Sequence, residues 1–289
     1  MANNISKRKH KIFYPQDPPW ESFLFQHHFN LLCDPRVGIW RTAILREVKE
    51  GDVVLELGSG TGILSMFAAS RAKKVYAVEV DSRLVEYSRW AIEQAGLSDN
   101  ITVINKDARE LDLPEPVDLV IAEMLDTAMI QEPQVPVLRE VLDRVLKPNG
   151  RVIPQKVITS IALAYCDYDF YKFKLPLPHF ETTEVRKVQK LFSSPVVYHE
   201  MDFRKPLEKH LHRELEISIQ STGVANSLKI ESETCLIENL VCDSSHWFNP
   251  PLVLPFPEIE VEEWDKIKVV LDYELGGGLK TLSYEVKEI

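Results

Sequence analysis

Apolar and polar positions follow one pattern in the first half of this chain and another in the second. Between residues 53 and 154, short apolar runs rich in β-branched residues alternate with amphipathic stretches of helical period. This alternation is typical of parallel strands covered by helices. The expected strands span residues 53–57, 74–80, 101–105, 117–122 and 151–153, and the expected helices span 62–72, 82–95 and 134–146. Residues 147–150 carry a turn signal. The pattern predicts an open, Rossmann-like α/β sheet with helices on both faces.

The pattern changes after Pro154. Residues 159–165, 214–220, 227–236, 266–273 and 280–286 alternate apolar and polar side chains, with no long helices between them, which is typical of strands. Gly276, Gly277 and Gly278 separate the last two runs and predict a hairpin turn. The stretch 168–195 fits neither period, so an inserted arm and a surface loop both stay open. We expect an N-terminal segment at 1–50, a nucleotide-binding domain at 51–154 and a mainly β domain at 155–289.

Composition narrows the class of protein. The chain is 45% hydrophobic and 27% charged, which is typical of a globular protein with a full core. Its formal net charge of −10 disfavours nucleic acid as a partner and gives a weak preference for basic ones. An apolar run long enough to span a membrane is absent from the sequence, and the basic first residues lack a signal core. We therefore expect a soluble, cytoplasmic protein without a membrane partner.

The cysteines give no sign of a metal site. They show neither a C-x-x-C pair nor a histidine at ligand spacing, so buried, reduced thiols are expected at Cys33, Cys166, Cys235 and Cys242.

A glycine-rich turn follows the first expected strand and opens a helix. Its backbone can approach a nucleotide-like ligand at Gly58, Ser59, Gly60, Thr61 and Gly62. The glycine spacing differs from the G-x-G-x-x-G of dinucleotide folds, and no Walker-type Lys follows. Glu56, just before the turn, would repel a pyrophosphate but can accept a hydrogen bond from the ammonium of a methionine moiety. This charge selects S-adenosylmethionine as the cofactor.

Two further acids are expected at the same edge of the sheet. Glu79 closes the second strand, about twenty residues after the turn, where an acid bonds ribose hydroxyls in such folds. Asp107 follows the third strand and is placed to receive an adenine amino group, with the amide of Ala108 nearby. Either acid alone also fits a solvated loop, but both lie in register with the glycine turn.

Two glutamates flank the loop after the fourth strand. Glu123 ends that strand, and Glu132 follows nine positions later across an apolar, turn-like stretch. Strand carboxyl ends face the ligand in open α/β sheets, so Glu123 is expected in the cofactor site. Paired carboxylates can perform acid/base chemistry, bind a metal or grip a cation. Because no His or Asp stands at ligand spacing, we expect no metal, and a planar guanidinium is the best match.

With these motifs in place, residues 53–154 resemble the catalytic core of the protein arginine methyltransferases. That family carries a double-glutamate loop with the same nine-residue separation, onto which Glu123 and Glu132 fall. It also carries a Thr-His-Trp loop in a following β-barrel, which Ser245-His246-Trp247 resembles. The family's helix that closes over the cofactor is similar to a segment containing His28, Leu31, Leu32, Asp34, Arg36 and Arg41. The likeness covers residues 26–160 well and the β domain more loosely.

The resemblance implies a class I methyltransferase with a barrel-like second domain and specific residue roles. Arg36 would bind the cofactor carboxylate, with His28 in the closing helix beside it. Asp34 would pair with His246, and this pair would dispose of the proton released on transfer. Glu123 and Glu132 would hold the acceptor guanidinium. A homodimer would follow if residues 168–195 act as the family's dimerisation arm.

The acid loop departs from the family pattern, which bears on the acceptor. Met124 replaces a Trp, Asp126 replaces a Gly, and Pro133 follows Glu132 where the family has a Met nearby. Asp126 is expected to be a surface or loop residue. Three functions stay open: methyl transfer to protein arginine, methyl transfer to a small amine or guanidine, and a non-catalytic cofactor-binding scaffold.

Overall fold

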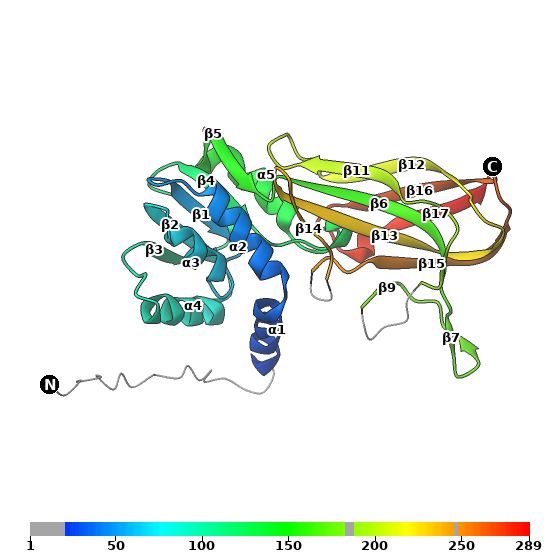
Figure 1. Ribbon diagram of the computed structural model, residues 1–289, viewed down its shortest axis with the longest axis horizontal. Helices are drawn as coiled ribbons and strands as arrows, with labels where there is room; N and C mark the ends of the chain where they lie inside the picture. The colour runs from blue at the N-terminus through cyan, green and yellow to red at the C-terminus, as the bar shows by residue number, and fades with distance from the viewer. Residues whose placement is uncertain (1–20, 183–187, 246–247) are drawn as a thin grey trace.

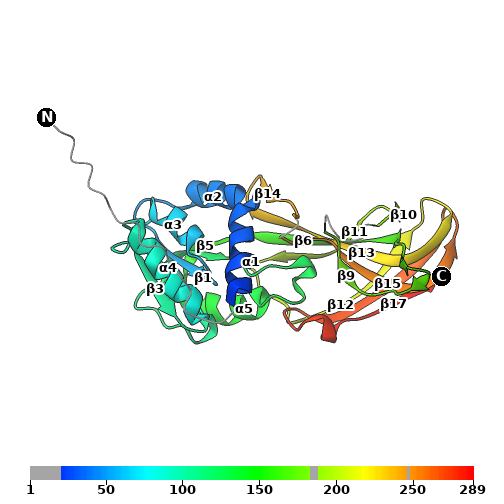
Figure 2. The ribbon, with the colours of Figure 1, turned by 90° about the horizontal axis from the view of Figure 1, so that it is seen from below.

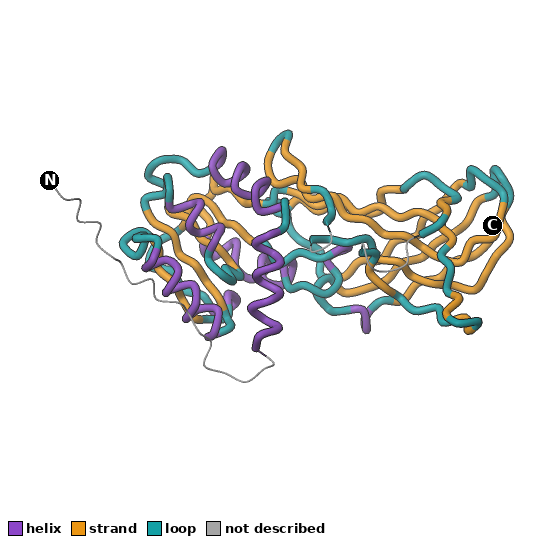
Figure 3. The backbone as a smooth tube through the Cα atoms, turned by 60° about the horizontal axis from the view of Figure 1, so that its bottom comes forward, coloured by secondary structure: helices purple, strands orange, loops and turns teal. Residues whose placement is uncertain are grey.

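The computed structural model describes residues 21–182, 188–245 and 248–289. An α/β part and an elongated β part lie end to end (Figure 1), and the first helix runs across their junction (Figures 2 and 3). The helices are α1 (Glu21–Cys33), α2 (Arg36–Glu47), α3 (Ile63–Ala69), α4 (Ser82–Gln94) and α5 (Gln134–Val145). Short 3-10 turns lie at η1 (Ala108–Glu110), η2 (Thr127–Met129) and η3 (Leu279–Thr281).

A five-stranded parallel sheet lies at the centre of the α/β part. Its strands are β1 (Val53–Leu57), β2 (Lys74–Glu79), β3 (Ile101–Asn105), β4 (Val117–Ala122) and β5 (Leu146–Ile153), in the order β3-β2-β1-β4-β5. Four of these match the expected strands to within one residue. Because strand order reverses between β1 and β4, the crevice beyond their carboxyl ends is the natural ligand site of such a sheet. The Rossmann-like prediction is confirmed.

One boundary in this sheet was predicted wrongly. Residues 147–150 were expected to form a turn, yet the structure includes them in β5. The pairing explains this, because Val117 lies opposite Leu146 and Leu119 lies opposite Arg151, with a register shift between them. Residues 147–150 therefore form an irregularity in the strand pairing, opposite a single residue of β4.

The β part consists of antiparallel strands. A seven-stranded sheet has the order β10-β6-β13-β15-β9, with β11 added on β6 and β14 on β13, and a three-stranded sheet has the order β12-β16-β17. The long strands are β6 (Lys156–Tyr165), β11 (Val196–Asp202), β12 (His210–Ser218), β13 (Gly223–Ile237), β15 (Leu252–Val261), β16 (Lys266–Glu274) and β17 (Ser283–Glu288). The short strands are β7 (Asp169–Phe170), β8 (Phe173–Lys174), β9 (His179–Phe180), β10 (Lys190–Leu191) and β14 (Leu240–Cys242).

This arrangement confirms a mainly β second half and refines its details. The paired strands of the described residues form open sheets rather than one closed barrel. The glycine triplet does separate an antiparallel pair, β16 and β17. The last strand begins at Ser283 rather than at the expected residue 280, because η3 occupies residues 279–281. Strands β11 and β15 were not expected.

One hydrophobic core joins the two parts. It contains strand residues of the parallel sheet, such as Ile121, together with β-part residues such as Tyr273 and Leu275. The loop after β4 lies between them, with Ala128 and Met129 almost fully buried. The position of this loop therefore depends on both parts of the molecule.

Candidate active site

A cavity of about 330 Å³ opens at the carboxyl ends of β1 and β4. Helices α1 and α2, the glycine turn and the loop after β4 supply its walls. Its lining residues include His28, Arg36, Glu56, Gly58, Ser59, Gly60, Thr61, Glu123, Met124 and Glu132. Most of the predicted site residues thus converge on one cavity at the reversal of strand order.

The glycine turn lies so close to its neighbours that side chains at Gly58 and Gly60 would crowd Met124 and His28. Gly60 has a φ of +51°, and a Cβ there would lie 3.1 Å from His28 Cε1. A Cβ on Gly58 would lie 2.8 Å from Met124 Cγ. Glu79 fastens the turn, since its Oε2 accepts from the Gly60 N–H at 2.9 Å. The turn is therefore a bare backbone surface facing the cavity.

Several predicted site residues lie outside the cavity lining: the catalytic candidate Asp34 and the cofactor candidates Gly62, Glu79, Asp107 and Ala108. Glu79 is buried against the turn, and its second oxygen accepts from the Asp81 N–H at 2.9 Å. Asp107 caps η1 and pairs with Arg109 Nη2 at 2.6 Å. Its hydrogen bonds with Arg109 lower the pKa of the Asp107 carboxyl. In this arrangement the Asp107 carboxylate bonds within its own turn and stabilises η1.

Arg36 and Glu123 form a buried ion pair inside the cavity. The distance between Arg36 Nη1 and Glu123 Oε1 is 2.7 Å, and the side chains are 7% and 19% exposed. The Arg36 guanidinium also stacks on Phe248 at 5.0 Å from the ring centre. Its Nε is buried without a hydrogen-bond partner. This orphaned donor is available to a ligand carboxylate.

Asp34 holds the junction between α1 and α2. Its Oδ1 accepts from the Arg36 N–H at 2.9 Å, and its Oδ2 accepts from Ser245 Oγ at 2.6 Å. The predicted partner of Asp34, His246, lies outside the described residues, as does Trp247. Ser245, which directly precedes His246 in the sequence, nevertheless contacts Asp34, the residue with which His246 was expected to pair.

Three carboxyl groups crowd the cavity, and burial disfavours their charge. Burial raises the pKa of Glu56 to about 8, opposed by a short hydrogen bond from Ser65 Oγ. Burial also raises the pKa of Glu123, opposed by the charge of Arg36. The pKa of Glu132 is raised by burial and by the charge of Glu123. The cavity therefore favours a positively charged ligand, which would stabilise the ionised carboxylates.

Asp126 lies in a loop, as expected, but its side chain is partly buried and organises the acid loop. Its Oδ2 accepts from Gln131 N at 3.0 Å and its Oδ1 from Glu132 N at 3.2 Å. Burial raises the pKa of Asp126 to about 7. Sequence reasoning also missed Gln134, which is fully buried and bonds the backbone on both sides of Glu123. The replacement of a family Gly by Asp126 is the only sequence signal for that residue, and no departure from the family pattern pointed to Gln134.

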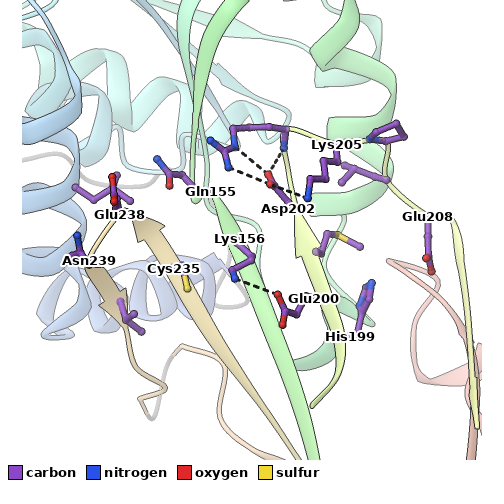
Figure 4. Close-up of a pocket in the computed structure, with 16 residues that line it drawn as sticks. Gln155, Lys156, His199, Glu200, Asp202, Lys205, Glu208, Cys235, Glu238 and Asn239 are labelled. Carbon is purple, nitrogen blue, oxygen red and sulfur yellow. Dashed lines mark hydrogen bonds and ion pairs between the residues drawn. The ribbon is translucent and has the colours of Figure 1, made fainter. Parts of the chain in front are cut away.

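A wider groove of about 560 Å³ lies on the β part, among β6, β11 and β13 (Figure 4). Its charged groups pair with one another: Lys156 lies 3.2 Å from Glu200, and Asp202 lies 3.1 Å from Arg204. Burial raises the pKa of the Cys235 thiol in this groove, which disfavours a reactive thiolate. All four cysteines are free, and Cys33 is exposed rather than buried as expected. The cavity at the carboxyl ends of β1 and β4 is therefore the better candidate site.

The cavity fits S-adenosylmethionine on its own chemistry. Three buried polar atoms without partners, Arg36 Nε, Trp40 Nε1 and Ser59 Oγ, belong to residues that line it. The glycine turn offers the space that a Cβ would fill. The raised pKa of Glu56 matches a cationic methionine moiety.

Among the described residues, no helix is long and apolar enough to cross a membrane.

Comparison with known proteins identifies the fold and the domain. A family model described as a methyltransferase domain matches residues 54–150. An uncharacterized protein of Methanocaldococcus jannaschii is 38% identical, and the match covers 89% of this chain and 95% of that protein. A probable histone-arginine methyltransferase of Arabidopsis thaliana is 30% identical over 85% of this chain and 51% of its own length. An arginine N(omega)-methyltransferase of Streptomyces achromogenes is 38% identical over 44% of this chain and 37% of its own length.

A solved structure shows the same architecture. The Trypanosoma brucei PRMT1 enzyme–prozyme heterotetrameric complex with AdoHcy has a chain that superimposes with a TM-score of 0.73 at 20% identity. The match covers 91% of this chain and 96% of that chain. The cavity and the methyltransferase domain agree on the cofactor, and the solved structure shares the fold. The chain belongs, with its Methanocaldococcus relative, to a divergent family of class I S-adenosylmethionine-dependent methyltransferases built like the protein arginine methyltransferases.

Proposed function

We propose that this enzyme transfers a methyl group to a guanidinium nitrogen of protein arginine. The observation that carries the proposal is the Arg36–Glu123 pair, because a guanidinium already lies against Glu123 inside the cavity at 2.7 Å. A carboxylate has lone pairs for more than one donor, so Glu123 can accept from a second guanidinium as well. Glu132 lines the same cavity and adds a second negative charge.

S-adenosylmethionine, when bound, supplies a methyl group that the sulfonium has already activated. In our proposal Arg36 Nε holds the cofactor carboxylate, and Glu56 accepts from the ammonium. The backbone from Gly58 to Gly62 lies against the nucleoside. Glu79 receives the ribose hydroxyls through lone pairs not used by Gly60 and Asp81.

The remaining roles belong to the base end and to the proton. Asp107 and Ala108 receive the adenine, which requires Asp107 to share its carboxylate with Arg109. His28 covers the glycine turn from α1. His246, oriented by Asp34, disposes of the released proton.

The two glutamates would act by position and charge. Transfer to nitrogen is an in-line displacement, so aligning donor and acceptor supplies most of the catalysis. Glu123 and Glu132 would draw the positive charge of the guanidinium toward their side, which leaves the attacking nitrogen more nucleophilic. Because burial raises the pKa of both acids, the arriving guanidinium also lowers these pKa values and keeps the carboxylates ionised.

The variant Glu123→Gln tests this role. It keeps the shape of the side chain and removes its charge, so we expect turnover to be lost while the affinity for S-adenosylhomocysteine stays within about threefold. Radiolabelled cofactor and arginine-rich peptides measure the first quantity, and calorimetry measures the second. Glu115→Gln, at an acid far from the cavity lining, is the matched control. Retained turnover in Glu123→Gln would refute the proposed role.

A second candidate acceptor is a small guanidine such as free arginine. The Streptomyces relative carries the name arginine N(omega)-methyltransferase. The altered acid loop, with Met124, Asp126 and Pro133, also favours a change in acceptor. Offering labelled cofactor together with peptides and with free arginine separates the two candidates. Label in peptides supports the first candidate, and label confined to the small molecule supports the second.

We further propose a homodimer in which residues 168–195 act as an arm. We also propose that residues 51–154 bind the cofactor and that residues 155–289 bind the substrate. The β7–β8 hairpin extends from the β part (Figure 1). The hairpin and the following segment expose five large apolar side chains: Phe170, Tyr171, Phe173, Leu175 and Leu177. The solved relative is a heterotetrameric complex, in keeping with assembly through such a surface.

A further inference from the structure

The backbone on both sides of Glu123 is held by a side chain from α5. Gln134 is the first residue of that helix and is fully buried. Its Nε2 donates to the carbonyl of Ala122 at 3.0 Å, and its Oε1 accepts from the N–H of Met124 at 3.0 Å. In a parallel ladder, a residue opposite Glu123 would bond the same C=O and the same N–H. Gln134 thus replaces a neighbouring strand with a side-chain amide.

This replacement occurs where the sheet ends. The pairing of β4 with β5 reaches Ile121 opposite Ile153, and the pairing of β4 with β1 reaches Ala122 opposite Leu57. Glu123 comes directly after these last paired residues. Its backbone lies beyond the described ladders, and the amide of Gln134 extends the order of the sheet to it.

A second side chain holds the other acid. The carboxylate of Asp126 accepts from the N–H of Gln131 and from the N–H of Glu132 itself. Between them the loop is tightly turned, since Ala128 and Met129 both have positive φ. Asp126 therefore closes the loop on which Glu132 stands and fixes the peptide group of Glu132 directly.

We propose that Gln134 and Asp126 are positioning residues that hold Glu123 and Glu132 so that both carboxylates converge on one acceptor guanidinium. This inference rests on the proposed function. Neither side chain is among those that line the cavity, so both act through the glutamates. Asp126 lies in the loop that departs from the family pattern, and Gln134 begins the helix that follows this loop. In this chain, side-chain hydrogen bonds supply the order that the loop needs.

The variant Gln134→Met tests the proposal, because Met has a similar length and offers neither the donor nor the acceptor. The chain provides a matched control in Asn226, another buried amide. Asn226 accepts from the N–H of Cys166 and donates to its carbonyl, both at 2.9 Å, but lies in the β part. Asn226→Leu removes the same kind of clamp away from the acid loop.

We expect Gln134→Met to lower kcat for the guanidinium acceptor roughly 100-fold, because a small displacement of an aligned group has an effect of this size. The affinity for S-adenosylhomocysteine should change by less than about threefold, and Asn226→Leu should leave kcat within about threefold. If both variants lose kcat equally, or if Gln134→Met keeps it, the positioning role is wrong.

The variant Gln134→Glu adds a readout that a merely structural role would not move. A protonated carboxylic acid donates one hydrogen bond and accepts another, as the amide does, whereas the carboxylate can only accept. The ratio of Gln134→Glu activity to wild-type activity should therefore rise as pH falls. A ratio independent of pH contradicts the proposal.

Hydrogen exchange separates failure of this inference from failure of the proposed function. The N–H of Met124 should exchange at least about tenfold faster in Gln134→Met than in wild type or Asn226→Leu. In Asp126→Ala, the N–H of Glu132 should do the same. These exchange rates are measured without a methyl acceptor. They therefore decide whether the hydrogen bonds of Gln134 and Asp126 hold the loop, even if the wild type methylates no guanidine. Unchanged protection in both variants would overturn the inference.

Discussion

The backbone N–H of Gly276 donates to the carbonyl of Met129 at 2.9 Å, so the turn between the last two strands is bonded to the acid loop. Gly278 adds a second bond of this kind, to the carbonyl of Ile130 at 2.7 Å. The β part also accepts from Ala128 N at 2.9 Å through Ser232 Oγ. The glycine triplet is therefore a hairpin turn that also anchors the loop between the two glutamates.

Replacing Gly276 should disturb this anchor more than it disturbs the backbone itself. Gly276 has a φ of +71°, and a Cβ there would lie 2.8 Å from Pro136 Cδ and 3.2 Å from the carbonyl of Glu132. Gly96 has the same φ, but a Cβ there would meet nothing within 4 Å. We expect Gly96→Ala to destabilise by about 1 kcal/mol through φ alone, and Gly276→Ala by about 2 kcal/mol more through overpacking.

Urea unfolding of both glycine variants measures this difference. Only Gly276→Ala should also raise KM for the acceptor, because only that clash reaches Glu132. Equal destabilisation of the two variants would show that the turn adapts without moving the loop.

Binding of the cofactor should release a proton from Glu56. The pKa of Glu56 is raised to about 8 by burial, so this side chain is mostly protonated at neutral pH before a ligand enters. The positive charge of the cofactor lowers that pKa, so the proton leaves on binding. The release should approach one proton at about pH 7 and vanish at about pH 9.5, where Glu56 is already ionised.

Calorimetry in buffers with different ionisation enthalpies measures this release. The variant Glu56→Gln removes the titrating group and retains a polar side chain of the same shape. It should bind without the proton release at neutral pH. An unchanged release in Glu56→Gln would assign the proton to another group.

Arg36 and Glu123 should prove strongly coupled. Removing one partner of a buried ion pair leaves an uncompensated charge, so Arg36→Met should destabilise by about 3 kcal/mol near neutral pH. Without Arg36, the pKa of Glu123 rises further above its usual range, so its protonation reduces the loss as pH falls. Adding Glu123→Gln to Arg36→Met should recover at least about 1 kcal/mol. Additive effects in this double-mutant cycle would show that the pair contributes nothing to folding.

The fold was predictable where a local pattern coincides with the final environment. β1 and β4 are largely apolar strands buried along nearly their whole length, and their predicted bounds match. The bounds of β3 also match, although this edge strand is only partly buried. β15 escaped prediction because Pro255 and Pro257 interrupt its pattern, and a proline normally argues against a central strand. The pairing of β15 with β13 overrides that local signal.

The site was predictable to the extent that strand ends position it. Glu56, the glycine turn and Glu123 follow directly from two strands, and the cavity collects them. Asp126 and Gln134 could not be found in this way, because their roles depend on hydrogen bonds made only when the loop closes. The pairing of Arg36 with Glu123 likewise requires α2 to fold over the sheet, which no local pattern specifies.

The exposed apolar surface of the arm supplies a last prediction, about assembly. Tyr171 is 95% exposed and Phe173 is 70% exposed, although side chains of this size gain free energy when they are buried. If these residues dock on a second copy, the double variant Tyr171→Ser/Phe173→Ser should shift a dimer to a monomer in light scattering. Trp264→Ser removes an 82% exposed aromatic from the turn between β15 and β16 and should leave the mass unchanged. A wild-type mass of one chain at high concentration would exclude the arm as a dimer contact, because the surface would then be exposed in the functional molecule.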